Sequence, residues 1–97
     1  MTVFAVSYRY TDDTATRDRL RPEHRAYLGG LADRGTLLLS GPYGAGEAPG
    51  ALLLFRAGDK AEVASLLEKD PFAVAGVVAD AEVIEWEPVL GPLQRAL

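Results

Sequence analysis

The strands that this sequence predicts are apolar at consecutive positions, and this feature limits the folds that the chain can adopt. Residues 3–6, 37–39 and 52–55 are uninterrupted apolar runs. Successive side chains of a strand point to opposite faces of its sheet, so a sheet with one face in water alternates apolar and polar residues. These runs do not alternate. Both faces of the sheet must therefore be covered.

Strand and helix patterns follow one another along the chain. Apolar, β-branched and aromatic stretches predict four strands, at residues 3–8, 36–40, 51–57 and 81–89. Helical spacing of apolar residues predicts helices at about 14–34 and 59–69, and a short helical turn over 70–76. Residues 41–50 hold four glycines and two prolines, which indicates a loop. The order βαββαβ predicts a single α+β domain over residues 1–97 with the ferredoxin-like arrangement.

Two prolines refine this prediction. Pro22 falls inside the first helical stretch, and we expect it in the first turn of a second helix, where proline is well tolerated. Pro88 lies in the last predicted strand and places that strand at or near a sheet edge. On the helix that Asp59 caps, we expect the buried side to consist of Val63, Ala64, Leu66 and Leu67.

The apolar strands also predict a partner. In the βαββαβ order both helices normally cover the same face of the sheet, which leaves the other apolar face open. An exposed apolar face of this size is unusual for a monomer. The simplest cover is a second copy of the chain, with the two sheets packed face to face about a twofold axis. We therefore expect a homodimer.

The reactive side chains are few. The chain has one histidine, His24, and no cysteine. This composition excludes disulfides, thiolate zinc sites, iron–sulfur clusters, cysteine nucleophiles and a multi-histidine metal site within one chain. Gly44-Ala45-Gly46 begins like a dinucleotide-binding fingerprint, but a strand rather than a helix follows it. We expect no metal and no cofactor.

The charge distribution bears on the class of partner. The formal net charge of −4 argues against a nucleic-acid-binding protein, which is normally basic. No apolar run is long enough to span a bilayer, and residues 1–10 do not resemble a secretory signal, so we expect a cytoplasmic protein without membrane contact. Five of the ten basic residues are concentrated between residues 17 and 34. That cluster is either a solvated helix face or a site for an anionic ligand.

His24 lies on the buried side of the first helix. An apolar stripe with helical spacing contains it, formed by Leu20, His24, Tyr27, Leu28 and Leu31. Two interpretations are open: a histidine that simply satisfies its hydrogen bonds in the core, or a general base or acid in a cleft between helix and sheet. Arg21, one helical turn earlier, is either a surface residue or a group that binds a carboxylate or phenolate.

Two further positions are candidates. Asp70 precedes Pro71 and is expected to cap a short helix. A carboxylate close to the lone histidine would also fix its tautomer and stabilise the imidazolium, and the two roles do not exclude one another. Ser40 ends the second predicted strand, a position where site residues often occur.

Taken together, these motifs resemble the YCII-related domain family. The resemblance spans about residues 1–90 and rests on Arg21-Pro22-x-His24, Gly35-x-Leu37, Gly41-Pro42 and Asp70-Pro71-Phe72 with Gly76 nearby. It implies a dimeric α+β barrel and an active site built on a His–Asp pair, which here falls on His24 and Asp70. It also implies that the turn at Gly41 and Pro42 forms one wall of the site.

The resemblance implies cofactor-free proton transfer or elimination on small cyclic or enolisable compounds. One member of the family is a dehydrochlorinase of a chlorinated hydroxyhydroquinone, and muconolactone isomerases share the wider superfamily. The leading hypothesis is a lyase or isomerase in which His24 is the general base and acid and Asp70 orients it. Arg21 would attract an anionic group of the substrate, and Ser40 and Tyr43 would line the pocket. The alternatives are a non-catalytic dimeric module that binds a small ligand or a protein, and a cofactor-free monooxygenase.

Overall fold

The apolar runs form a four-stranded antiparallel sheet. The computed structural model describes all residues 1–97, with strands β1 Thr2–Tyr10, β2 Leu37–Pro42, β3 Gly50–Ala57 and β4 Val78–Trp86. The helices are α1 Thr14–Asp33, α2 Lys60–Glu68 and α3 Pro71–Val74, and a 3₁₀ helix η1 spans Pro92–Ala96. The sheet order is β2-β3-β1-β4. This is the predicted ferredoxin-like α+β fold.

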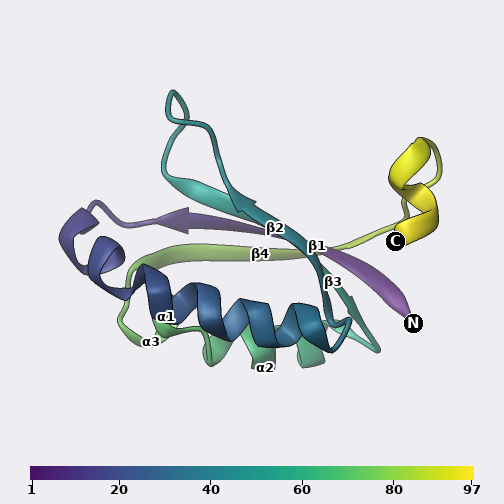
Figure 1. Cartoon of the computed structure of the whole chain (residues 1–97), viewed down its shortest axis with the longest axis horizontal. Helices are drawn as coiled ribbons and strands as arrows, with labels where there is room; N and C mark the ends of the chain where they lie inside the picture. The colour runs from purple at the N-terminus through teal and green to yellow at the C-terminus, as the bar shows by residue number, and fades with distance from the viewer.

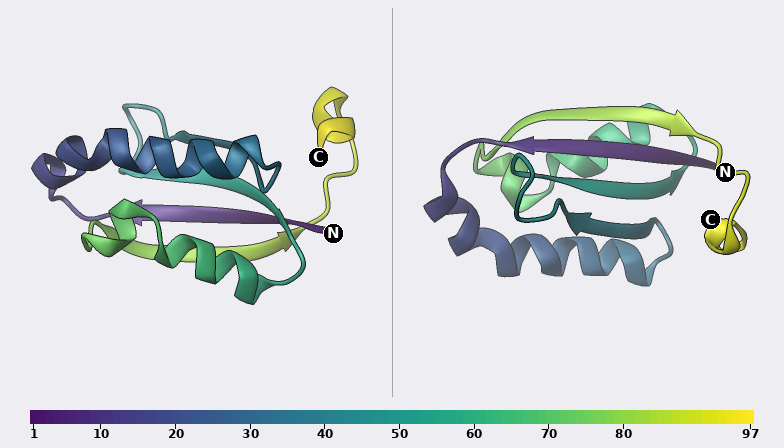
Figure 2. Two further views of the ribbon diagram at one scale, coloured as in Figure 1. Left: turned by 60° about the horizontal axis from the view of Figure 1, so that its bottom comes forward. Right: turned by 90° about the horizontal axis from the view of Figure 1, so that it is seen from above.

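Both long helices cover one face of the sheet, as Figures 1 and 2 show. Strand side chains of one parity point toward them, among them Phe4, Val6 and Tyr8 of β1 and Leu53 and Phe55 of β3. The core lies between this face and the buried sides of α1 and α2. The end of β1, the start of β3, the middle of α1 and the start of α3 meet at one end of this layer, and the candidate site lies there.

Pro22 does not begin a second helix. The helix α1 runs without interruption from Thr14 to Asp33 with Pro22 inside it, so that prediction was wrong. The proline removes one N–H from the helix ladder, and the Asp18 carbonyl loses its partner. Burial of His24, Leu28 and Leu31 against the sheet holds the helix together across this defect.

Two strand boundaries and the burial of one helix residue also differ from the prediction. β2 continues through Gly41 and Pro42, which pair with β3; because β2 is an edge strand, it tolerates a proline. β4 spans 78–86 rather than 81–89, so Pro88 lies beyond it, although the strand is at the predicted edge. Ala64 is exposed rather than buried, whereas Val63 and Leu67 are buried.

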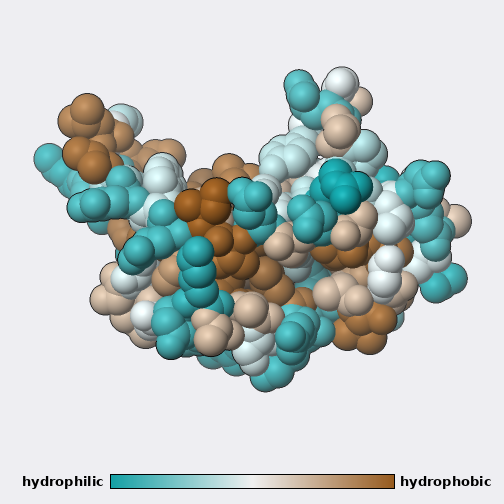
Figure 3. Space-filling view, turned by 180° about the vertical axis from the view of Figure 1, so that it is seen from behind, coloured by the Kyte–Doolittle hydropathy of each residue, from teal (hydrophilic) through white to brown (hydrophobic).

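The second face of the sheet carries exposed apolar side chains. Its large apolar residues Leu39, Leu52, Ile84 and Trp86 are each between 42% and 58% exposed. The C-terminal segment and the loop after β2 both rise on this side, away from the helices (Figure 1). Figure 3 shows apolar surface between these two projections. The face is thus open in the single chain. No helix is long and apolar enough to cross a membrane.

Candidate active site

A buried histidine–aspartate pair lies between α1 and α3. His24 Nδ1 is 2.8 Å from Asp70 Oδ1, and the two residues are 46 positions apart in sequence. Asp70 is fully buried and the His24 side chain is 11% exposed. α1 supplies the histidine from its buried stripe, and the Asp-Pro start of α3 supplies the carboxylate.

Three donors surround the Asp70 carboxylate. Its Oδ1 accepts from the Phe72 backbone N–H at 3.0 Å, which caps α3, and its Oδ2 accepts from the Tyr8 hydroxyl at 2.9 Å. Burial, the Asp70 charge and this hydrogen bond raise the pKa of Tyr8 far above its usual value, so Tyr8 stays a neutral donor. An ionised carboxylate only accepts hydrogen bonds, so Nδ1 of His24 is the third donor. Asp70 therefore both caps the helix and fixes the histidine tautomer.

In the neutral imidazole, that tautomer leaves Nε2 of His24 as the nitrogen without a hydrogen. Nε2 has no partner in the protein, and no buried side-chain nitrogen or oxygen lacks one, so Nε2 must be open to the cavity that His24 lines. The imidazole ring is held flat against Phe72, with ring centroids 3.8 Å apart and planes 5° apart. The ring is thus fixed by one hydrogen bond and one stacked contact, with a basic nitrogen facing outward.

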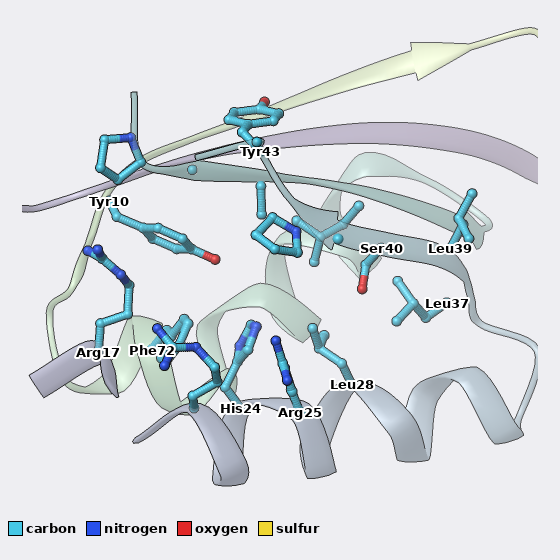
Figure 4. Close-up of a pocket in the computed structure, with 18 of the residues that line it drawn as sticks. Tyr10, Arg17, His24, Arg25, Leu28, Leu37, Leu39, Ser40, Tyr43 and Phe72 are labelled. Atoms are coloured by element: carbon cyan, nitrogen blue, oxygen red, sulfur yellow. The ribbon is translucent and has the colours of Figure 1, made fainter. Parts of the chain in front are cut away.

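The cavity in front of His24 has a volume of about 630 Å³. It lies between α1, the β2 strand with its following loop, and the start of β3, and Figure 4 shows the His24 ring directed into it from the helix. The Ser40 side chain points into it from β2, and the Tyr10 hydroxyl extends into it from the end of β1 (Figure 4). A space of this size fits a small molecule of one or two rings.

Cationic side chains dominate the charge of the cavity. Arg17, Arg21 and Arg25 are spaced four residues apart on α1 and all line it, whereas Glu47 is the one acidic lining residue. Arg21 pairs with Asp18 at 2.8 Å, and Arg17 donates to the Thr11 carbonyl at 2.9 Å. Arg25 makes no ion pair within the chain. The cavity therefore favours an anionic occupant.

The structure brings the predicted site residues together. Six of them line the cavity: Arg21, His24, Ser40, Gly41, Pro42 and Tyr43. Asp70 does not reach the cavity and lies behind His24. Five residues of the site were not predicted: Tyr8, Tyr10, Arg17, Arg25 and Phe72. Tyr8 and Tyr10 could have been found from their spacing, because residues two apart at the end of a strand lie on the same face.

Tyr10 completes the aromatic wall of the site. Its ring meets Phe72 edge-on, with centroids 5.5 Å apart and planes at 88°, and the Arg17 guanidinium lies 5.0 Å from its centre. Burial, followed by the Asp70 charge, raises the pKa of Tyr10 to about 12, although Arg17 and Arg21 lower it in part. Its hydroxyl makes no hydrogen bond within the chain. No group of three or more His, Asp or Glu side chains is placed to hold a metal ion.

Comparison with known protein families shows which family the chain belongs to. The model of the YCII-related domain matches residues 1–87, which is most of the chain. The chain belongs to the YCII-related domain family. No curated protein matches it significantly.

A solved structure similar to this YCII-related domain is an enzyme. It is 5-chloro-2-hydroxyhydroquinone dehydrochlorinase from Burkholderia phenoliruptrix AC1100, in complex with 2,5-dihydroxybenzoquinone. The two chains share 28% sequence identity and superpose with a TM-score of 0.75, over 87% of this chain and 92% of the other. The likeness is thus to a whole domain of nearly the same extent.

Proposed function

We propose that this YCII-related domain is a cofactor-independent lyase or isomerase that transfers protons on a small phenolic or enolisable compound. The observation that carries the proposal is the buried 2.8 Å contact between His24 Nδ1 and Asp70, which leaves Nε2 facing the cavity. A positioned base of this kind contributes typically 10²–10⁴-fold to a reaction rate. That contribution suits a substrate whose proton is already acidic.

The chemical step follows from the tautomer. Nε2 of His24 takes a proton from a carbon or hydroxyl of the substrate, and the released electron pair forms a C=C or C=O bond. In an elimination, a leaving group on the neighbouring carbon departs with its own bonding pair. In an isomerisation, the imidazolium returns the proton to another carbon. Asp70 stabilises the imidazolium through Nδ1 in either case.

The charge of the cavity supports an anionic substrate or intermediate. Arg21 and Arg25 lie on the same helix as His24 and flank it by one turn or less. Their guanidinium groups would attract a phenolate or carboxylate and stabilise the enolate that forms when the proton leaves. Ser40 and Tyr43 would contact the substrate from β2 and the following loop. The neighbour's bound 2,5-dihydroxybenzoquinone, a small acidic ring compound, is of this class.

The assembly that we propose is a homodimer formed through the open sheet face. Leu39, Leu52, Ile84 and Trp86 supply an apolar surface on that face, and strands of a second copy offer the same surface about a twofold axis. Light scattering at micromolar concentration should give twice the 10.4 kDa chain mass, and Leu52→Asp should lower it to one chain. A wild-type mass of one chain would contradict this assembly.

Exchange of substrate protons with solvent tests the catalytic proposal without a known substrate. A panel of cyclic diones, hydroxylated quinones and enolisable acids is incubated with enzyme in D₂O, and deuterium incorporation is followed by NMR. Chloride release from 5-chloro-2-hydroxyhydroquinone is measured in parallel. We expect exchange or release with at least one compound, and a loss of 10²-fold or more in His24→Gln.

Asp59→Asn, at an exposed helix cap that does not line the cavity, is the matched control for Asp70→Asn. Asp70→Asn should lose most of the activity while Asp59→Asn retains it. Retention of activity in His24→Gln would disprove the role of the base. Compounds that bind without exchange or release anywhere in the panel would instead favour a non-catalytic ligand-binding module.

A further inference from the structure

We propose that the Tyr10 hydroxyl donates the hydrogen bond that holds the substrate oxygen on which negative charge develops as His24 removes the proton. This inference rests on the proposed function and assigns a second catalytic group to the same cavity. Tyr10 keeps its own proton throughout, so the balance of the reaction is unchanged. Three observations support the assignment.

The Tyr10 ring is fixed without the help of its hydroxyl. Phe72 contacts the ring edge-on at 5.5 Å, Tyr8 lies 6.0 Å away, and the Arg17 guanidinium covers it at 5.0 Å. Arg17 is itself anchored by its bond to the Thr11 carbonyl. A ring held in this way presents its hydroxyl in one place, which is the pre-organisation that stabilisation of a transition-state charge requires.

The hydroxyl of Tyr10 makes no hydrogen bond within the chain, in contrast to those of the other two buried or half-buried tyrosines, Tyr8 and Tyr27. Tyr8 donates to Asp70 at 2.9 Å, and Tyr27 donates to the Leu66 carbonyl at 2.7 Å. Tyr10 has no such partner, and because no buried side-chain oxygen lacks one, its hydroxyl must be open to the cavity that it lines. With a pKa of about 12 it keeps its proton at neutral pH and remains a donor.

Tyr10 and His24 share one supporting ring. Phe72 stacks on the imidazole at 3.8 Å and receives the Tyr10 ring on its edge at 5.5 Å. Figure 4 shows the hydroxyl and the imidazole directed into the same space from β1 and α1. The base and the hydrogen-bond donor are therefore placed on either side of one small occupant. The Arg17 guanidinium over the ring partly offsets the effects of burial and of the Asp70 charge, because its positive charge lowers the pKa of Tyr10.

Binding of an acidic ring compound measures this hydrogen bond directly. The probe is 2,5-dihydroxybenzoquinone, which is anionic at neutral pH, and 2,5-dimethoxybenzoquinone is the matched neutral compound. Tyr10→Phe keeps the ring and removes the donor. We expect this variant to bind the anion about tenfold or more weakly, because hydrogen bonds to charged groups are the strong ones, and to bind the neutral compound as the wild type does.

Tyr27→Phe is the control, because it removes a half-buried tyrosine hydroxyl that does not line the cavity. Equal affinity of wild type and Tyr10→Phe for the anion would overturn the assignment, and so would a failure of the wild type to bind the anion. Exchange of substrate protons with solvent distinguishes a failure of this inference from a failure of the proposed function. Exchange that depends on His24 and not on Tyr10 overturns only this inference, whereas exchange independent of His24 overturns the proposed function.

Discussion

Replacing Asp70 by alanine should cost several times as much stability as replacing Asp59 by alanine. Both aspartates cap helices: Asp59 accepts from the Glu62 N–H at 2.9 Å and Asp70 from the Phe72 N–H at 3.0 Å. Asp59 is exposed and has no other partner, whereas Asp70 is fully buried with two further donors. Comparing the two variants therefore distinguishes the cost of losing a helix cap alone from the cost of also leaving buried donors without a partner.

The expected magnitudes follow from these contacts. Loss of a cap costs about 1 kcal/mol of unfolding free energy, which is the whole effect expected for Asp59→Ala. In Asp70→Ala the His24 Nδ1 and the Tyr8 hydroxyl also lose their partner, at about 1–3 kcal/mol each. The total is about 3–7 kcal/mol. This is a large part of the roughly 5–15 kcal/mol that stabilises a natural domain.

Urea unfolding followed by far-ultraviolet circular dichroism, at one protein concentration, measures both variants. Asp70→Asn covers the case in which Asp70→Ala does not fold. The amide oxygen of the new asparagine still accepts hydrogen bonds from the Phe72 N–H and from His24. The amide NH₂ replaces the oxygen that accepted from Tyr8, so the Tyr8 hydroxyl must rotate and act as an acceptor instead. We therefore expect a loss of about 1–2 kcal/mol of unfolding free energy. Equal losses in Asp70→Ala and Asp59→Ala would show that the carboxylate is a cap and nothing more.

Three other predictions concern the loss of stability at alkaline pH, a close backbone contact at Gly50 and the proline inside α1. The folded chain keeps the protons of Tyr8 and Tyr10 after the unfolded chain has lost them, so unfolding free energy should fall as pH rises from about 10 to 12; Tyr10→Phe should flatten this decline in urea titrations. In Gly50→Ala the new Cβ would collide with the Tyr8 carbonyl oxygen, and the melting temperature should drop, with a loss of about 1–3 kcal/mol of unfolding free energy. Pro22→Ala restores a donor to the Asp18 carbonyl and should raise the unfolding free energy by about 1–2 kcal/mol, after allowance for the freer unfolded chain. The denaturation midpoint should rise with it, and an unchanged midpoint would show that the helix has already adapted to the proline.

The fold could be predicted because its signals are local. Apolar runs and helical stripes gave the order βαββαβ, and capping residues such as Asp59 and Asp70 marked where helices begin. The ends of the strands were harder to predict from the sequence, because pairing with a neighbouring strand decides where each strand ends. Gly41 and Pro42 look like a turn by composition, yet they belong to β2 because β3 continues alongside them. Pro22 was misplaced for the same reason: burial of the helix outweighs a local preference.

The site could be predicted only in part. The helical stripe placed His24 on a buried face, but the partner 46 residues away was suggested by the family resemblance rather than by any local pattern. The aromatic contacts of Tyr10 and Phe72 depend on how β1 and α3 meet in space, which one sequence does not reveal. Arg17 was one of five clustered basic residues, and nothing distinguished it from those that face solvent.

The double role of Asp70 has a consequence for how relatives of this chain should be compared. A relative that has lost its activity would still need the carboxylate, since the start of α3 and the Tyr8 hydroxyl depend on it. His24 makes one hydrogen bond and one stacked contact, so a substitution there would remove the proposed base at a smaller cost in stability. In a set of homologous sequences, retention of the aspartate would therefore report inheritance of the fold, and retention of the histidine would report continued selection for the reaction.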